Sequence, residues 1–117
     1  EKIDGGDGFD EIRGTNYRQI WDFSNVELVS IELINGDRHG DVIIGSRGND
    51  TLKGGHGDDN LNGGPGTDTA VYDGKAQDYS IETYGDTVYV TALQSDEGKD
   101  TLLHIEKLKF ADVTISL

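Results

Sequence analysis

Five aspartates in this chain lie in glycine-rich loops, and four of them are spaced nine residues apart. The four regular copies follow one another without a gap over residues 36–71 and read GDRHGDVII, GSRGNDTLK, GGHGDDNLN and GGPGTDTAV. Every copy begins with glycine, has aspartate at its sixth position and has a small or apolar residue at its eighth. An earlier copy, GGDGFDEIR, covers residues 5–13. The aspartates are Asp10, Asp41, Asp50, Asp59 and Asp68.

An acid and several glycines in each loop are the residue types that a calcium site needs. Ca²⁺ takes six to eight oxygen ligands at about 2.3–2.6 Å. One carboxylate per loop cannot fill that shell, so backbone carbonyls must supply the other ligands and the chain must turn sharply. Glycine tolerates the positive φ angles and the close backbone approach that such a loop requires. The repeats therefore predict calcium ions held between loops.

The three residues that follow each aspartate are predicted to form a short strand. Their apolar middle residue points inward and its neighbours point outward, because side chains alternate along a strand. Loops and strands that alternate every nine residues make a flattened coil with two repeats per turn. The predicted fold class is therefore all-β, a parallel β-roll, which is a form of β-helix.

Alternate loops of such a coil should stack, which brings two pairs of aspartates together. The loop that ends at Asp41 should lie over the loop that ends at Asp59, and the loop that ends at Asp50 over the one that ends at Asp68. We predict two ions, one shared by each pair. The Asp41 site is expected to be the weaker one, because His39 replaces glycine at the fourth position of its loop.

The N-terminal part of the chain keeps the repeat only in degenerate form. Residues 14–22 stay in register but have Gln19 where aspartate belongs, and residues 23–35 break the period. Two alternatives remain open for Asp10. It either binds an ion together with a ligand from the irregular stretch, such as Asp22 or Asn25, or it binds none.

The composition favours folding that depends on metal and excludes several other functions. Only 33% of the 117 residues are hydrophobic and none is cysteine, so ions are the remaining way to stabilise a thin core. The formal charge of −13 argues against nucleic-acid binding, which needs a Lys/Arg patch. No apolar run approaches the ~20 residues that span a bilayer. No nucleophile–base pair is visible, so we expect a non-catalytic module.

We expect one domain in three parts, and we expect it to be a piece of a larger protein. Residues 1–35 carry degenerate repeats and an irregular strand segment. Residues 36–71 form the regular calcium-binding roll, and residues 72–117 form an antiparallel β cap. The stack should end at residue 71, because the next copy would place Gln77 at the ligand position.

Short strands are predicted outside the repeats as well. The aliphatic segment at 29–34 reads as one strand. In the cap, alternating apolar residues at 78–83 and 86–92 indicate a β-hairpin. Segments 102–110 and 113–117 complete the cap, which hides the exposed end of the coil as the end of a solenoid requires.

The repeats resemble the RTX module, the calcium-binding β-roll of bacterial proteins exported by type I secretion, such as serralysin-like proteases. The resemblance covers residues 5–13 and 36–71, and the tail GKDTLLHIEKLKFADVTISL is similar to the segment that often follows such repeats. It implies that carbonyls complete each ion's shell. The implied carbonyl ligands are Gly36, Arg38, Gly55 and Gly57 in the first site, and Gly45, Arg47, Gly64 and Gly66 in the second.

The resemblance also implies a folding switch. In a calcium-poor cytosol the acidic loops repel one another, and the chain stays unfolded enough to pass through the type I secretion apparatus. Outside the cell, calcium binds and folding follows, because metal-binding free energy becomes folding free energy when the unfolded chain has no site. The implied protein is bacterial, secreted or at the cell surface, and monomeric, with two or more Ca²⁺ ions.

A binding module of an adhesin or of a polysaccharide-acting enzyme is the alternative function. Glycan binding would need an exposed row of aromatic side chains. Tyr72, Tyr79, Tyr84 and Tyr89 are the candidates, although packing in the core or cap is their expected use. A catalytic site in the cap is the third hypothesis, and no residues can be assigned to it.

Overall fold

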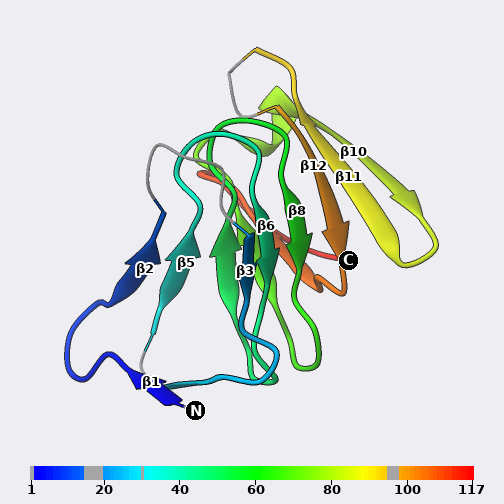
Figure 1. The fold of residues 1–117 in the computed structure, drawn as a ribbon. Coiled ribbons are helices and arrows are strands. Elements are labelled where there is room, and N and C mark those ends of the chain that lie inside the picture. Colours follow the sequence, from blue (N-terminus) through cyan, green and yellow to red (C-terminus); the bar gives the residue numbers. More distant parts are fainter. Residues whose placement is uncertain (1, 15–19, 30, 95–97) are drawn as a thin grey trace.

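The computed structural model describes residues 2–14, 20–29, 31–94 and 98–117, and the regular secondary structure within them is almost entirely β-strand (Figure 1). Sheet I has the strand order β14-β13-β9-β7-β5-β2, and sheet II has the order β10-β11-β12-β8-β6-β3. Strands β1 and β4 form a separate pair. The bounds are β1 Lys2–Asp4, β2 Glu11–Arg13, β3 Ile20–Asp22, β4 Glu27–Val29, β5 Leu33–Asn35, β6 Val42–Ile44, β7 Thr51–Lys53, β8 Asn60–Asn62, β9 Thr69–Val71, β10 Tyr79–Tyr84, β11 Thr87–Ala92, β12 Lys99–Leu103, β13 Lys107–Lys109 and β14 Thr114–Ser116, with a 3₁₀ helix η1 at Ala76–Asp78.

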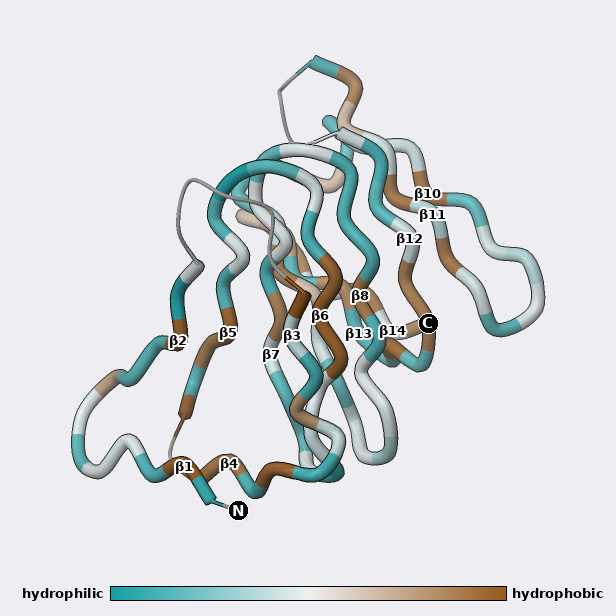
Figure 2. The backbone as a smooth tube through the Cα atoms, in the orientation of Figure 1, coloured by the Kyte–Doolittle hydropathy of each residue, from teal (hydrophilic) through white to brown (hydrophobic). Residues whose placement is uncertain are grey.

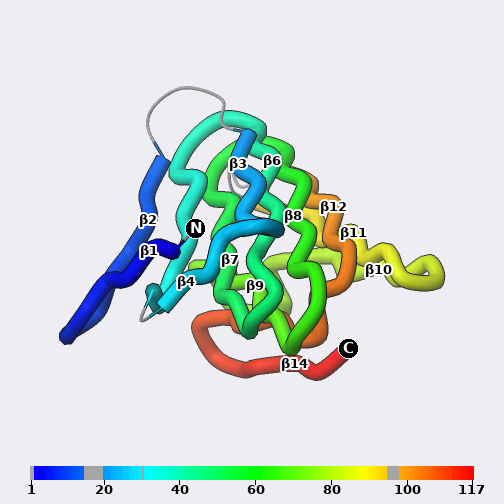
Figure 3. Tube along the Cα trace, turned by 60° about the horizontal axis from the view of Figure 1, so that its bottom comes forward, coloured from blue at the N-terminus to red at the C-terminus, as the bar shows by residue number. Residues whose placement is uncertain are grey.

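The nonapeptides form a parallel β-roll, as the spacing predicts. Successive repeat strands alternate between the two sheets, and each strand pairs with the strand two repeats later (Figure 3). Val42 lies opposite Asn60 in sheet II, and Thr51 lies opposite Thr69 in sheet I. One complete turn therefore contains two nonapeptides, and the predicted stacking of alternate loops is confirmed.

One inward side chain per short strand builds the core of the roll. The middle residue of each repeat strand is buried, whereas the residues on either side are partly or fully exposed. Figure 2 shows these positions as hydrophobic bands between hydrophilic loops. Burying such a side chain is worth about 1.5–3 kcal/mol, so a nine-residue repeat gains little from its apolar core. The stacked inward residues are Ile34, Leu52, Ala70 and Leu108 in sheet I, and Ile43, Leu61 and Leu102 in sheet II.

The N-terminal turn is wider than the regular turns. Glu11 lies opposite Leu33, whereas Thr51 lies opposite Thr69, so this turn contains four more residues. The additional residues include β4, which pairs in parallel with β1. The prediction of one strand over 29–34 is therefore wrong: β4 ends at Val29 and β5 begins at Leu33, because the chain changes sheets between them.

The cap continues the roll before it turns antiparallel. β12 and β13 pair in parallel with β8 and β9, so the stack does not end at residue 71 as predicted. The hairpin expected at 78–83 and 86–92 is present as β10 and β11, which extend sheet II antiparallel to β12. β14 closes sheet I antiparallel to β13. Rings of Tyr72, Tyr79 and Phe110 pack together beneath this cap.

Candidate metal centre

Acidic side chains occupy the same position in each turn. Each acid lies two residues before the inward-pointing residue of its strand. They form two columns, one along each sheet. Column I follows sheet I and contains Asp10, Glu32, Asp50, Asp68 and Glu106. Column II follows sheet II and contains Asp41, Asp59 and Asp100.

The same pattern of hydrogen bonds joins the levels of column II from Asp41 onward and of column I from Asp50 onward. In column II the Asp41 amide donates to Asp59 Oδ1 at 2.8 Å, and the Asp59 amide donates to Asp100 Oδ1 at 3.0 Å. In column I the Asp50 amide donates to Asp68 Oδ1 at 2.8 Å, and the Asp68 amide donates to Glu106 Oε1 at 2.7 Å. One oxygen of each accepting carboxylate is thus fixed by the backbone of the turn before it.

The second carboxylate oxygens are buried, and several have no hydrogen-bond donor. Asp50, Asp59 and Asp68 are 7%, 1% and 0% exposed. The Oδ2 atom of each of these three is inaccessible to solvent and unpartnered. An ionised oxygen in such a place is costly unless a cation or a donor reaches it. These atoms are therefore suited to a divalent cation.

The same burial raises the pKa values of these carboxyl groups in the metal-free chain. Burial is the largest cause of the rise in the pKa of Asp59 to about 9, and the charges of Asp100 and Asp41 add to it. Burial likewise raises the pKa of Asp68 to about 7, with further contributions from the charges of Asp50 and Glu106. The pKa of Asp50 is raised by burial as well, against the hydrogen bond from Ser46. The columns are electrostatically unfavourable without a cation.

Glycine at the first repeat position leaves the space that the carboxylate occupies. A Cβ atom at Gly45 would lie 2.6 Å from Asp50 Oδ2, and one at Gly63 would lie 2.5 Å from Asp68 Oδ2. Real Cβ atoms do not approach so closely, so any other residue would displace the acid. The loop thus holds its carboxylate in a cradle of its own backbone.

Glycines at the second and fourth positions let neighbouring loops stack closely. Gly66 has a φ of 98° and Gly57 a φ of 92°. A Cβ at Gly66 would lie 2.6 Å from the Gly48 carbonyl oxygen in the adjacent loop. The loop at 36–41 lacks glycines at these positions, and Asp37 and His39 adopt φ values of 78° and 69° instead. Aspartate tolerates this left-handed region, but histidine is strained there, so the replacement of glycine by His39 costs this loop stability.

The structure brings together the side chains that the sequence paired. The Asp41 loop stacks on the Asp59 loop, and the Asp50 loop stacks on the Asp68 loop. The eight predicted carbonyl residues lie on these same stacked loops. They are Gly36, Arg38, Gly55 and Gly57 on one pair, and Gly45, Arg47, Gly64 and Gly66 on the other.

Asp10 lies beside a residue that the sequence argument did not consider. Its carbonyl accepts hydrogen bonds from the amides of Glu32 at 2.9 Å and Leu33 at 3.3 Å. Asp22, one of the partners expected for Asp10, is on β3 in the opposite sheet and accepts from the Ser24 amide. The register of β2 against β5 explains this placement. Gln19, which takes the ligand position in the sequence between these elements, lies outside the described residues.

Three column members were missed because they lack the glycine half of the repeat. No GGxGx segment comes before Glu32, Asp100 or Glu106. In each case, however, an apolar residue stands two positions after the acid, as in the D-x-L-x part of the regular repeat. The segments are ELIN, DTLL and EKLK. This spacing of an acid and an apolar residue is the sequence signal that could have identified the three column members.

The C-terminal end of column II is closed by a protein donor. The Tyr72 hydroxyl donates to Asp100 Oδ2 at 3.0 Å, while Asp100 Oδ1 accepts the Asp59 amide. Tyr72 and Tyr79 are 5% and 7% exposed, so the row of four exposed tyrosines considered above does not exist. Tyr84 and Tyr89 remain adjacent on the hairpin, with rings 5.8 Å apart.

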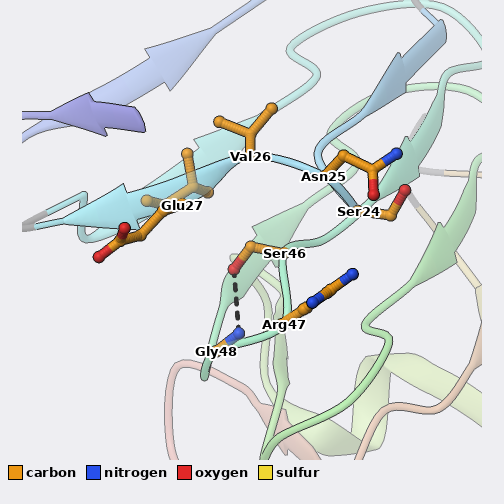
Figure 4. Close-up of a pocket in the computed structure, with 8 residues that line it drawn as sticks. Ser24, Asn25, Val26, Glu27, Ser46, Arg47 and Gly48 are labelled. Atoms are coloured by element: carbon orange, nitrogen blue, oxygen red, sulfur yellow. Dashed lines mark hydrogen bonds between the residues drawn. The ribbon is translucent and has the colours of Figure 1, made fainter. Parts of the chain in front are cut away.

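A cavity separates the irregular N-terminal segment from the loop at 45–50. It has a volume of about 620 Å³ and is lined by residues 24–28 and 46–48 (Figure 4). Within it the Gly48 amide donates to Ser46 Oγ at 3.2 Å.

Among the described residues no three His, Cys, Asp or Glu side chains form one metal-binding group. Carbonyls must therefore contribute to any ion that two carboxylates share.

Comparison with known families agrees with this geometry. Residues 35–70 match the model of the RTX calcium-binding nonapeptide repeat in four copies. These residues are therefore similar to RTX calcium-binding nonapeptide repeats, and in this structure they form a parallel β-roll. No helix in the described part of the chain is long and apolar enough to cross a membrane.

Two further comparisons concern whole proteins. The structure is similar to that of the extracellular lipase LipA from Serratia marcescens, with 24% sequence identity and a TM-score of 0.39. The similarity covers 67% of this chain and 14% of the lipase chain. No curated protein sequence gave a significant match.

Proposed function

We propose that the chain is a calcium-dependent folding module of a larger secreted bacterial protein. It stays unfolded where calcium is scarce, which permits export through a type I secretion apparatus, and it folds as a monomer when calcium binds outside the cell. The observation that carries the proposal is the pair of carboxylate columns, whose buried Oδ2 atoms at Asp50, Asp59 and Asp68 have no donor.

Calcium would supply the positive charge that these columns lack. The two proposed ions lie between stacked loops, one with Asp41 and Asp59 and one with Asp50 and Asp68. Backbone carbonyls on those loops complete each shell. In the first site they are Gly36, Arg38, Gly55 and Gly57, and in the second they are Gly45, Arg47, Gly64 and Gly66.

The balance of forces supports a switch better than a permanently folded domain. The core has one buried side chain per repeat strand, while Asp59 and Asp68 each bury a carboxyl group whose pKa is raised. Metal binding adds its free energy to folding when only the folded chain has the site. Calcium modules outside cells typically bind at about 10⁻⁴–10⁻³ M, which suits a transition between cytosol and exterior.

The test is a far-ultraviolet circular-dichroism titration of calcium-depleted protein at pH 7.5. We expect a disordered spectrum without metal, strand signal as calcium reaches millimolar concentration, and little response to magnesium. Mg²⁺ demands near-octahedral geometry and retains its waters, so it fits carbonyl-lined loops poorly. A full strand spectrum in metal-free protein would contradict the switch, and an absence of bound calcium in the folded protein would contradict the sites.

Export is tested separately by fusing the chain to a reporter in a strain with a type I secretion system. The Asp→Asn substitutions at Asp41, Asp50, Asp59 and Asp68 should leave export intact and abolish calcium-induced folding of the exported product. Loss of export from a variant that cannot fold would contradict the proposed order of events.

A further inference from the structure

Column I extends beyond the four matched repeats at its N-terminal end. Asp10, Glu32 and Asp50 precede β2, β5 and β7, which are neighbouring strands of sheet I. Glu11 lies opposite Leu33, and Ile34 lies opposite Leu52. The three acids therefore stand at successive levels, although only Asp50 belongs to the matched repeats.

All three acids have a buried oxygen without a hydrogen-bond partner. These atoms are Asp10 Oδ2, Glu32 Oε2 and Asp50 Oδ2. The Asp50 side chain is buried, because the residue is only 7% exposed. The ion pairs found among the described residues join Arg13 and Lys53 to other acids, and none of these pairs includes Asp10, Glu32 or Asp50. Buried carboxylate oxygens that no donor reaches are favourable positions for a cation.

The hydrogen bonds at the Glu32 level differ from those of the regular steps. At the next step the Asp50 amide binds Asp68 Oδ1. The Glu32 amide instead donates to the Asp10 carbonyl, and Asp50 Oδ1 accepts the Ser46 hydroxyl. Neither oxygen of Asp50 is therefore tied to the backbone of Glu32.

Glutamate is a suitable ligand where a turn of the roll is longer than the regular length of two nonapeptides. Glu106, at the other end of column I, also follows a long insertion, and its Oε1 reaches the Asp68 amide at 2.7 Å as an aspartate does in the regular steps. The longer side chain thus spans a wider turn. The loop before Asp10 has the repeat sequence GGDGFD, and its Gly6 and Gly8 have φ values of 81° and 89°, like the second and fourth glycines of the regular loops.

We propose that Glu32 is a calcium ligand, which shares ions with Asp10 on one side and Asp50 on the other. The ion column along sheet I is then longer than the matched repeats, and it links the degenerate N-terminal turn to the regular roll. The proposal rests on the calcium-dependent function proposed above, and it assigns Asp10 a partner within column I.

The experiment counts calcium ions per chain after equilibrium dialysis at saturating calcium, with circular dichroism on the same samples. Glu32→Gln keeps the size of the side chain and removes its charge. We expect it to bind at least one ion fewer than the wild type and to need a severalfold higher calcium concentration for half of the strand signal. Glu27→Gln is the matched control, because Glu27 is exposed on β4 in the same segment, and it should keep the full ion count.

Asp10→Asn is the second variant and decides the matter if Glu32→Gln does not fold. Asp10 precedes the edge strand β2, so its substitution should remove one ion and retain the strand signal. A full ion count in the folded Glu32→Gln variant, or in Asp10→Asn where the first variant is unfolded, overturns the proposal and leaves the calcium switch standing. If the wild type itself binds no calcium, the proposed function fails first.

Discussion

Removing one buried charge should stabilise the metal-free roll and weaken the calcium-loaded one. Asp68 is the clearest position, because it is fully buried and its raised pKa of about 7 has burial as its main cause. Asn at this position keeps an oxygen that can accept the Asp50 amide, as Asp68 Oδ1 does now. Asp68→Asn therefore changes the charge and retains the shape.

The magnitude follows from the difference between the two states. The pKa rises from 3.8 to about 7 on folding, and one pKa unit corresponds to about 1.4 kcal/mol. Holding Asp68 ionised at pH 8 without metal therefore costs the fold up to about 4 kcal/mol, an upper bound because solvent and structural relaxation reduce it. Domains are stable by only about 5–15 kcal/mol in total, so one such group matters.

The pH dependence has a definite sign. Because folding raises the pKa of Asp68, its contribution to stability is fully present below the unfolded pKa of 3.8 and is lost as the pH rises to about 7. Calcium-depleted wild type should thus gain strand signal between pH 8 and pH 4. Asp68→Asn should need less trimethylamine N-oxide than the wild type to fold at pH 8, because this osmolyte favours compact states. At pH 4 the two should behave alike.

Asp86→Asn is the matched control, because it also removes one negative charge but Asp86 is exposed in the turn between β10 and β11. It should change the osmolyte midpoint little. With calcium the order reverses, and Asp68→Asn should require a higher calcium concentration than Asp86→Asn. Equal osmolyte midpoints for the two variants at pH 8 would refute the argument that buried charge opposes metal-free folding.

Two further predictions concern the loop backbones. Gly66→Ala and Gly85→Ala both place alanine at a positive φ, but only at Gly66 would the Cβ meet a stacked loop. In urea unfolding with calcium, Gly66→Ala should cost at least about 2 kcal/mol and Gly85→Ala about 1 kcal/mol; equal losses would mean that the loops do not stack closely. His39→Gly should stabilise the calcium-loaded roll by up to about 1 kcal/mol, because it relieves a positive φ of 69°. His56→Gly, in the adjacent loop, has no such strain to relieve, and a gain there equal to that of His39→Gly would contradict the explanation.

The regular roll was predictable because its period appears directly in the sequence. Two nonapeptides per turn fix which strands pair, and the alternation in Thr51-Leu52-Lys53 fixes the inward face. The hairpin of β10 and β11 was predictable from alternation around Gly85. These features depend on residues close in sequence or on an exact repeat, so local rules were sufficient.

The extent of the columns was not predictable by the same means. Glu32 and Glu106 reach their places because turns of unequal length restore the register of β5 and β13. Nothing in the sequence sets the length of such an insertion, and parallel pairing over a long separation leaves no local pattern. For this reason the sequence argument considered Asp22 as a partner for Asp10, although Asp22 is on β3 in the opposite sheet.

The cap end of column II shows how the fold limits its need for metal. At the cap, Asp100 receives the Asp59 amide and the Tyr72 hydroxyl, so both oxygens have protein donors. Tyr72 also packs in the aromatic cluster of the cap, which makes that donor part of a metal-independent core. At Asp50 and Asp68 of column I, by contrast, a protein donor reaches only Oδ1, and the buried Oδ2 atom has none. The demand for cations is therefore located in the repeats and the N-terminal turn, and the cap can end the roll with hydrogen bonds and apolar packing alone.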